Sequence, residues 1–275
     1  MRRKRKVKSL LQIYRKSKRS SVLVHFVLRT LVILCMIFQL IRGDLNNAFL
    51  CLLSLILFTL PVFVQIRFKI KLPRLLETII YLFIFAAEIL GEIYNFYGNV
   101  PNWDTMLHTI NGFICAGIGF ALVELLNENS KKINLSPLYM GLVAFCFSMT
   151  VGVCWEFIEY AADNVLSTDM QKDTVVQSIS SVELNSENKN VAVKIQEIER
   201  TVLYDAEGNE IAVIEGGYLD IGLHDTMKDM LVNLIGAVVF SFFGFFYEKN
   251  REKYKFAGNF IPTKNVDVPH LEGDI

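Results

Sequence analysis

Residues 22–41 decide the fold class of this chain, and they read VLVHFVLRTLVILCMIFQLI. An α-helix of about twenty residues is about 30 Å long, which matches the hydrocarbon core of a bilayer. Within this stretch only His25 and Arg29 can carry a charge near neutral pH. Because lipid offers the backbone no hydrogen-bond partner, we expect so long an apolar stretch to cross the membrane as a helix.

Five more apolar stretches of similar length follow. They are residues 48–66, 75–94, 105–126, 138–161 and 227–247. The 275 residues carry 28 Lys and Arg against 28 Asp and Glu, so net charge does not distinguish this chain from a soluble protein, whereas its blocks of apolar residues do. The sequence predicts an all-α polytopic membrane protein with a six-helix transmembrane bundle. Pro61 falls inside the second stretch, where it predicts a kink.

Basic residues predict the orientation of the bundle. Residues 1–21 contain ten Lys and Arg and no acid, so the N-terminus is expected in the cytoplasm. Counting alternate sides puts the other Lys- and Arg-rich connections inside too, and with them both termini. A cleaved signal peptide fits less well, because the apolar stretch is long and no small-x-small site follows it. The basic segment is interpreted as a topology signal beside anionic lipid, so we expect no nucleic-acid partner.

These expectations give five segments. They are a basic cytoplasmic N-terminus (1–21), spans one to five (22–163), an extracytoplasmic loop (164–224), span six (225–247) and a cytoplasmic tail (248–275).

The 164–224 loop is acidic, and its second half is expected to form β-structure. Residues 201–204 and 211–214 are apolar stretches joined by a turn that contains Gly208, which is typical of a β-hairpin. A small β-rich extracytoplasmic loop is therefore predicted. All five cysteines lie in the predicted spans, so no disulfide framework or CxxC metal site is expected.

Ionisable side chains are costly inside a membrane, so those in the predicted spans are the functional candidates. With the amide residue Asn233 they form four sets: Glu88 and Glu92; Asp104 and His108; Glu156, Glu159 and Asp163; and Asp225, Asp229 and Asn233. Within each set neighbouring members are three or four residues apart, so each set shares one helix face. The alternating topology puts all four sets in the outer half of the membrane. We therefore expect one polar pocket beneath the outside loop.

Simpler interpretations exist for some of these residues. Asp104, Asp163 and Asp225 lie close enough to predicted helix ends for capping to explain them. The residues deeper in the spans need a partner within the bundle. Lys228 is the nearest basic residue, and helical spacing is expected to turn it away from the acidic stripe.

Carboxylates packed without cations must stay protonated or bind a cation. Carboxylate oxygens together with one imidazole suit a divalent ion such as Mg, Mn, Ca or Zn. The predicted metal ligands are His108, Asp104, Glu156, Asp225 and Asp229. The predicted catalytic residues are Glu156, Glu159 and Asp229. Supporting roles are expected for Glu88, Glu92, Asp163 and Asn233.

Three motifs resemble a known group. They are Trp103-Asp104-Thr105-x-x-His108 with Gly112, Trp155-Glu156-x-x-Glu159-Tyr160-x-x-Asp163, and Asp225-Thr226-x-x-Asp229-x-x-x-Asn233-x-x-Gly236. Together they resemble the YjdF-like bacterial membrane proteins. More distantly they are similar to the VanZ-like proteins associated with glycopeptide resistance.

The VanZ-like pattern has Asp-x-x-x-His, Glu-x-x-Gln and Asp-x-x-x-Asn-x-x-Gly elements, and the chain matches it except that Glu159 stands where that family has Gln. The resemblance covers spans three to six. It implies a bacterial cell-envelope setting and multi-pass insertion in the cytoplasmic membrane.

Three functions are compatible with such a pocket. A metal-dependent hydrolase or transferase would act on a lipid or lipid-linked envelope precursor, because lipid headgroups lie at the depth of the predicted site. A proton- or cation-coupled carrier would use the same carboxylates, although no inverted repeat or pair of broken helices is evident. A non-catalytic envelope accessory protein would hold a structural cation. Membrane lipid is a predicted partner in every case, and the sequence sets no oligomeric state.

Overall fold

The structure is a computed structural model, and it describes residues 2–68, 70–129, 135–187 and 189–264, with no account of the side chains of residues 2–21, 128, 129, 166 and 264. The chain divides into two compact units. The first comprises Met1–Gly152 and Val232–Ile275, and the second comprises Val153–Leu231. In the described residues five helical stretches are long and apolar enough to cross a membrane: Val22–Arg42, Leu45–Phe68, Trp103–Asn127, Pro137–Val165 and Leu223–Lys249.

The first unit opens with the long helix α1 (Arg2–Arg42), which continues well beyond the apolar stretch at its N-terminal side. A tight turn at Gly43, whose φ is +76°, returns the chain into α2 (Leu45–Leu57), and the Asp44 carboxylate caps this helix by accepting from the backbone N–H of Asn47. The helix stops at Phe58 and resumes as α3 (Leu60–Phe68). The predicted kink is therefore a short interruption, which fits the clash that Pro61 causes one turn earlier.

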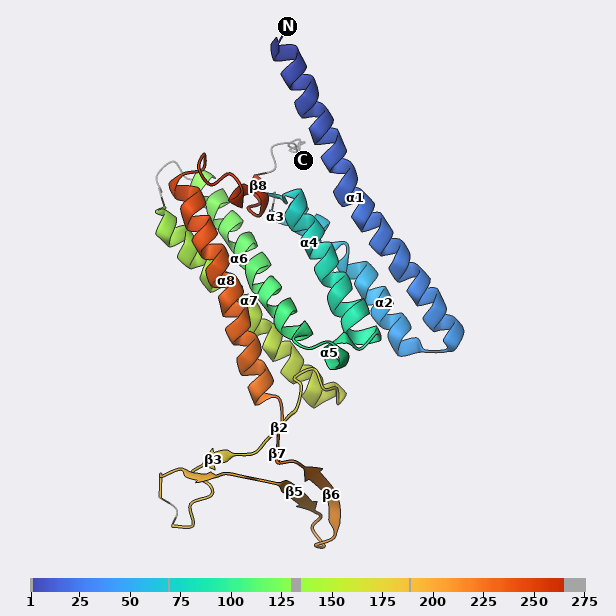
Figure 1. Cartoon of the computed structure of the whole chain (residues 1–275), viewed down its shortest axis with the longest axis vertical. Helices are drawn as coiled ribbons and strands as arrows, with labels where there is room; N and C mark the ends of the chain where they lie inside the picture. Colours follow the sequence, from blue (N-terminus) through green and yellow to red (C-terminus); the bar gives the residue numbers. More distant parts are fainter. Residues whose placement is uncertain (1, 69, 130–134, 188, 265–275) are drawn as a thin grey trace, which may run out of the picture. The chain divides into compact units, whose positions relative to one another are not determined.

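The third predicted span differs from an ordinary α-helix. The α-helix α4 (Arg74–Ile84) passes directly into a π-helix, η1 (Phe85–Ile93). Asn95, in the left-handed region, then precedes the short helix α5 (Phe96–Asn99). Helix α4 packs against α1, and η1 packs against α2 (Figure 1). This segment is not among the five apolar helices of spanning length, so the sixth span remains a prediction.

Three long helices complete the bundle: α6 (Trp103–Asn129), α7 (Pro137–Leu166) and α8 (Leu223–Lys249). Helices α7 and α8 are continuous but contribute to both units. We call the ends at Trp103, Leu166 and Leu223 the loop end, because residues 167–222 connect two of them. The opposite ends are called the tail end.

The residues after α8 fold back into the first unit, which the sequence did not predict. A 3₁₀ turn, η2 (Ala257–Asn259), leads to strand β8 (Thr263–Lys264), which pairs antiparallel with β1 (Ile70–Lys71). Ala257 and Ile261 are buried in the same apolar cluster as Phe120 and Phe240. The predicted cytoplasmic tail is thus partly a piece of the core.

The second unit contains short antiparallel strand pairs. Strand β2 (Thr174–Val176) pairs with β7 (Tyr218–Asp220), and β3 (Ile179–Ser181) pairs with β4 (Val193–Ile195). The predicted hairpin is confirmed as β5 (Arg200–Tyr204) and β6 (Glu210–Glu215), with Val202 opposite Val213. Gly208 has φ +86° in the connecting turn, a conformation that glycine adopts without strain.

Candidate functional site

Helices α6, α7 and α8 meet in the first unit at small residues. A Cβ atom added to Gly112 would lie 2.1 Å from the carbonyl oxygen of Asn233, and one added to Gly236 would lie 2.0 Å from the carbonyl oxygen of Thr109. Helices α6 and α8 therefore touch backbone to backbone, as small residues permit in membrane bundles. We call this contact, together with Ser148 and Gly152 of α7, the three-helix junction.

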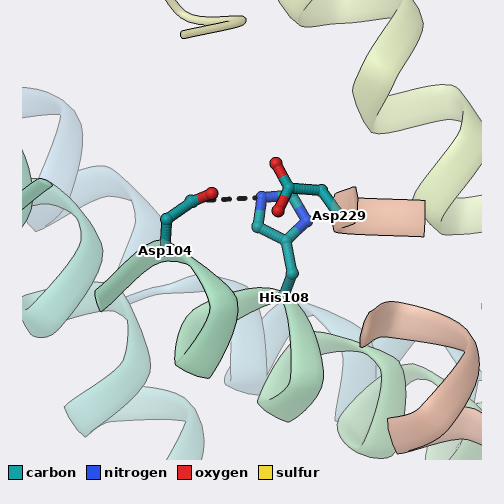
Figure 2. Close-up of side chains that lie close together, drawn as sticks. All are labelled: Asp104, His108 and Asp229. Atoms are coloured by element: carbon teal, nitrogen blue, oxygen red, sulfur yellow. Dashed lines mark ion pairs between the residues drawn. The ribbon is translucent and has the colours of Figure 1, made fainter. Parts of the chain in front are cut away.

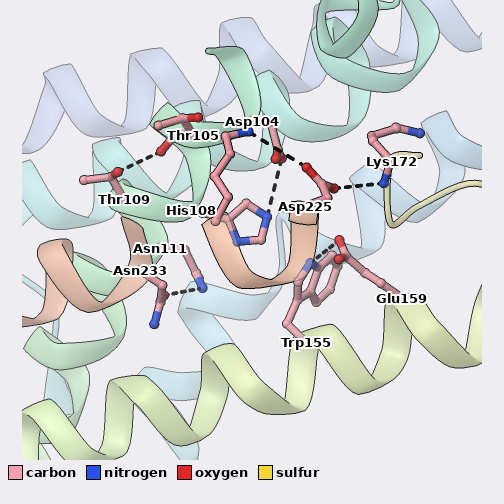
Figure 3. A network of polar contacts seen from close by, with 11 residues as sticks. Asp104, Thr105, His108, Thr109, Asn111, Trp155, Glu159, Lys172, Asp225 and Asn233 are labelled. Atoms are coloured by element: carbon pink, nitrogen blue, oxygen red, sulfur yellow. Dashed lines mark hydrogen bonds and ion pairs between the residues drawn. The ribbon is translucent and has the colours of Figure 1, made fainter. Parts of the chain in front are cut away.

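Helix α7 is joined to the three-helix junction by polar contacts. The Ser148 hydroxyl donates a 2.7 Å hydrogen bond to the carbonyl oxygen of Gly112, and Gly152 lies where a Cβ would meet the Asn233 amide at 2.7 Å. The Asn111 amide donates to the Asn233 side-chain oxygen at 3.4 Å (Figure 3). Asn233 is buried among all three helices, which fixes the rotation of each helix about its axis.

On the loop-end side of the junction, α6 presents an ion pair. Asp104 Oδ1 lies 3.4 Å from His108 Nε2 (Figure 2). His108 is buried, and Asp104 is in the first turn of the helix, where the positive end of the helix dipole favours a carboxylate. The predicted pairing of these two residues on one helix face is confirmed. Near them, the Thr105 hydroxyl is buried and has no hydrogen-bond partner in the described part of the chain.

Two more ionisable residues stand one turn from the junction on the other helices. Glu156 follows Gly152 by four residues on α7, and Asp229 precedes Asn233 by four residues on α8. Glu156 is 5% exposed and Asp229 is 1% exposed. Both side chains are therefore buried.

The other predicted residues of the second unit have local partners. Glu159 accepts a 2.7 Å hydrogen bond from the indole of Trp155, one turn earlier on α7. Asp225 accepts from the backbone N–H of Lys172 at 2.9 Å (Figure 3). Its other oxygen lies 3.9 Å from Lys228 Nζ, so the expectation that Lys228 points away from the acidic stripe was wrong for Asp225. An i, i+3 spacing lets the flexible lysine reach back.

Asp163 organises the chain that leaves α7. Its carboxylate accepts from the backbone N–H groups of Met170 and Gln171 and from the Thr168 hydroxyl, at 2.6 to 2.8 Å. These bonds hold the first turn of the connecting loop against the helix end. Asp163 therefore has a structural role similar to capping, as its position near a predicted helix end allowed.

The remaining predicted pair lies on the π-helix. Glu88 is half-buried and Glu92 is exposed, both on η1 in the first unit. A π-helix in a membrane protein is often found at a functional site. The supporting role predicted for both residues stays a prediction.

The chain matches the model of a protein family described as predicted membrane protein, DUF2238, over residues 23–250. It belongs to this family. The match includes all of the five apolar helices of spanning length except Val22, and it establishes the chain as a predicted integral membrane protein. The finer likeness to VanZ-like proteins remains an expectation.

An uncharacterized protein of Thermotoga maritima is 29% identical to the chain over 83 residues. The aligned part is 30% of this chain and spans 41% of that relative's length. No solved structure matches the chain.

Two groups of polar or small residues, one at the junction and one at the tail end, were not predicted. Ser148, Gly152 and Asn111 build the three-helix junction, and their signal in the sequence is the spacing of small and polar residues by four on apolar helices. Glu124, buried on α6, accepts a 2.6 Å hydrogen bond from Arg251 at the tail end. An acidic residue inside an apolar stretch was the signal for Glu124.

Proposed function

We propose that this membrane protein binds one divalent cation at the loop end of α6, α7 and α8, with His108, Asp104 and Asp229 as ligands. The proposal rests on the three-helix junction. The junction fixes which face of each helix points inward, and the next turn toward the loop end carries His108 on α6, Glu156 on α7 and Asp229 on α8. Because each helix is continuous through this turn, the three side chains are expected to converge.

The donor set suits a metal rather than an ion pair. One imidazole and two carboxylates are ligands that Zn²⁺ and Mn²⁺ accept, and the Thr105 hydroxyl offers a further oxygen. When ionised, Asp104 and Asp229 carry two negative charges, which a divalent cation would neutralise. Asp225 is a weaker candidate ligand because its oxygens already face Lys172 and Lys228.

The proposed reaction is hydrolysis or group transfer on a lipid or lipid-linked substrate of the bacterial envelope. A bound metal would supply Lewis acidity toward a phosphoryl or carbonyl oxygen. Glu156, which is buried, would take a proton from a nucleophile. Glu159 would orient the site through Trp155, whose indole holds its carboxylate. The envelope setting is the one that the VanZ-like resemblance implies, and the basic residues of the connections predict that the site is on the extracytoplasmic side.

A second candidate function is a proton- or cation-coupled carrier. The observation in its favour is irregular helix geometry in two packed elements. The α2–α3 stretch is interrupted at Phe58–Thr59, and η1, which packs against α2, is a π-helix carrying Glu88 and Glu92. In transporters such irregular helices line ion pathways. The carboxylates of the proposed cation site would then bind the coupling ion.

Metal analysis of the full chain purified in detergent tests the metal site. We expect about one Zn or Mn per chain, with His108→Ala and Asp229→Asn each losing most of the metal because each removes a ligand. Glu77→Gln is the matched control. It also removes one carboxylate, but Glu77 lies in the first turn of α4, a helix that supplies none of the proposed ligands. Equal metal content in all four proteins, or none after incubation with Zn²⁺ and Mn²⁺, contradicts the proposal.

Convergence can be tested without a metal. In a background with the five native cysteines replaced, His108→Cys combined with Asp229→Cys should form a cross-link with a short bifunctional thiol reagent. His108→Cys combined with Met227→Cys is the control, because Met227 is exposed and lies on another face of α8. A cross-link in the control but not in the test pair would show that the Met227 face of α8, rather than the Asp229 face, points toward His108.

A further inference from the structure

Helices α7 and α8 form an apolar groove at their tail ends, within the first unit. Its walls are Leu138, Leu142 and Phe145 of α7 and Val238, Phe242 and Phe245 of α8, and its volume is about 440 Å³. Such a volume lies in the range of small-molecule sites. The groove opens on the side of two helices that have the length and composition of membrane spans.

The floor of the groove is made by Gly141 and Ser241. A Cβ on Gly141 would lie 3.3 Å from the carbonyl oxygen of Ser241, so the glycine lets the two helices approach closely. The Ser241 hydroxyl is buried and has no hydrogen-bond partner among the residues that the structure describes. It is a free donor in an otherwise apolar groove.

A positive charge lies beside Phe245, one of the groove-lining residues. Lys249 Nζ lies 5.9 Å from the centre of the Phe245 ring, one turn beyond the last apolar wall residue. Val238, Phe242, Phe245 and Lys249 are three or four residues apart, so they form one stripe along α8. The stripe is apolar along its length and cationic at its tail end.

We propose that the groove binds one anionic phospholipid, with an acyl chain between the helices and its phosphate at Lys249. The apolar walls match the chain, and Lys249 complements the negative phosphate. The site is separate from the proposed cation site, because Phe145 and Glu156 are eleven residues, or about 16 Å, apart along α7.

The described residues of the chain's tail do not line the groove. Residues 257–264 pack elsewhere in the first unit, where the Phe260 ring lies 5.3 Å from that of Phe113 on α6. The groove-lining residues Leu138, Leu142 and Phe242 remain exposed. This leaves an amphipathic molecule from the surrounding membrane as the occupant that both the apolar walls and the lysine favour.

Native mass spectrometry of the delipidated full chain in detergent tests the proposal. Phosphatidylglycerol and phosphatidylcholine with the same acyl chains are titrated separately, and inorganic phosphate is titrated in a third arm. We expect about a fivefold preference for phosphatidylglycerol, the effect of one basic residue near an anionic lipid. Lys249→Gln should abolish this preference, and Lys255→Gln, which removes one exposed charge elsewhere, should keep it.

Leu142→Trp supplies a second variant, because its larger ring fills the groove and should weaken binding of both lipids. Loss of binding to both lipids with the same melting temperature as the parent supports the proposal. The proposal is overturned by equal binding of the two lipids, by unchanged preference in Lys249→Gln, or by phosphate binding as tightly as phosphatidylglycerol. Dimers that Leu142→Trp dissociates would assign the groove to a second copy of the chain instead.

Discussion

Among the α6 residues of the three-helix junction, Gly112 has the least room for a side chain. An added methyl group would overlap the Asn233 carbonyl oxygen on α8, a backbone atom that can move only if the helix moves. We expect Gly112→Ala to destabilise the protein by about 1–3 kcal/mol, as overpacking does. The measurement is the melting temperature in detergent.

Gly141→Ala is the matched control for this prediction, because the nearest atom to its new Cβ would be 3.3 Å away rather than 2.1 Å. It should change the melting temperature much less. Equal loss in the two variants would mean that the close approach of α6 and α8 is not what Gly112 provides.

Asp205 makes the hairpin turn sensitive to acid. Its carboxylate accepts from the side chain and backbone N–H of Asn209 and from the backbone N–H of Glu207, and these hydrogen bonds hold its pKa below the ordinary value. A folded pKa below the unfolded pKa of about 3.9 means that the stabilisation is complete above that pH and is lost as pH falls through the folded pKa.

Carbon NMR of the full chain labelled at aspartate carboxyls measures this titration. We expect the Asp205 resonance to titrate below pH 3.9 and the Thr201–Ile214 amide signals to broaden over the same acidic range. Asp205→Asn should remove that pH dependence of the turn. A midpoint at or above the ordinary aspartate value would contradict the prediction.

At the scale of elements, the tail is held by a charged contact as well as by apolar packing. Arg251 lies 2.6 Å from a Glu124 oxygen and 2.7 Å from a Glu248 oxygen. Because Glu124 is buried while the Arg251 side chain is 46% exposed, solvent screens part of the interaction. We expect Arg251→Gln to lower the free energy of unfolding by about 1–2 kcal/mol. This is the lower part of the range for leaving a buried charge without its partner.

Thermal unfolding in detergent measures this loss, and Glu124→Gln combined with Arg251→Gln is the control. The double variant leaves no buried carboxylate without its cation, so it should be more stable than Arg251→Gln alone. If the double variant is the less stable of the two, Glu124 is stabilised mainly by contacts other than Arg251.

Elements differ in how much of them could be predicted from the sequence. The long apolar helices and the β5–β6 hairpin follow from local patterns, namely apolar length and a glycine turn between alternating strands. The π-helix η1 does not, because no residue spacing in 85–93 distinguishes i→i+5 from i→i+4 hydrogen bonding. The folded tail does not either, since Ala257, Phe260 and Ile261 are a few apolar residues in a polar segment and are buried only by distant helices.

The same limit applies to the candidate site, of which only the contacts within one helix could be predicted. Spacing by four placed Asp104 beside His108, but it gave no contacts between helices, so the roles of Ser148 and Gly152 were missed. Spacing also cannot say how far a lysine side chain will reach, which is why the contact between Lys228 and Asp225 was not foreseen.

At the scale of the whole molecule, the untested expectation is its orientation in the membrane. The basic residues of 1–21 and the acidic loop 164–224 predict cytoplasmic termini and an extracytoplasmic loop. Ser186 is exposed in this loop, so Ser186→Cys in a background without native cysteines should react with a membrane-impermeant maleimide in intact cells.

A cysteine at Lys255, exposed after α8, is the control and should react only after the membrane is permeabilised. The reverse pattern would invert the topology and put the proposed cation site on the cytoplasmic side.

The pairing of β8 with β1 has a consequence for how the protein is made. Strand β1 leaves the ribosome long before β8, and the three long helices α6, α7 and α8 are synthesised between the two. Until residues 257–264 emerge, Ile70 and Leu72, which are buried in the finished protein, lack part of their cover. Insertion of the helices can therefore precede completion of the core, and nascent chains halted before residue 257 should be more sensitive to proteases than chains released at full length.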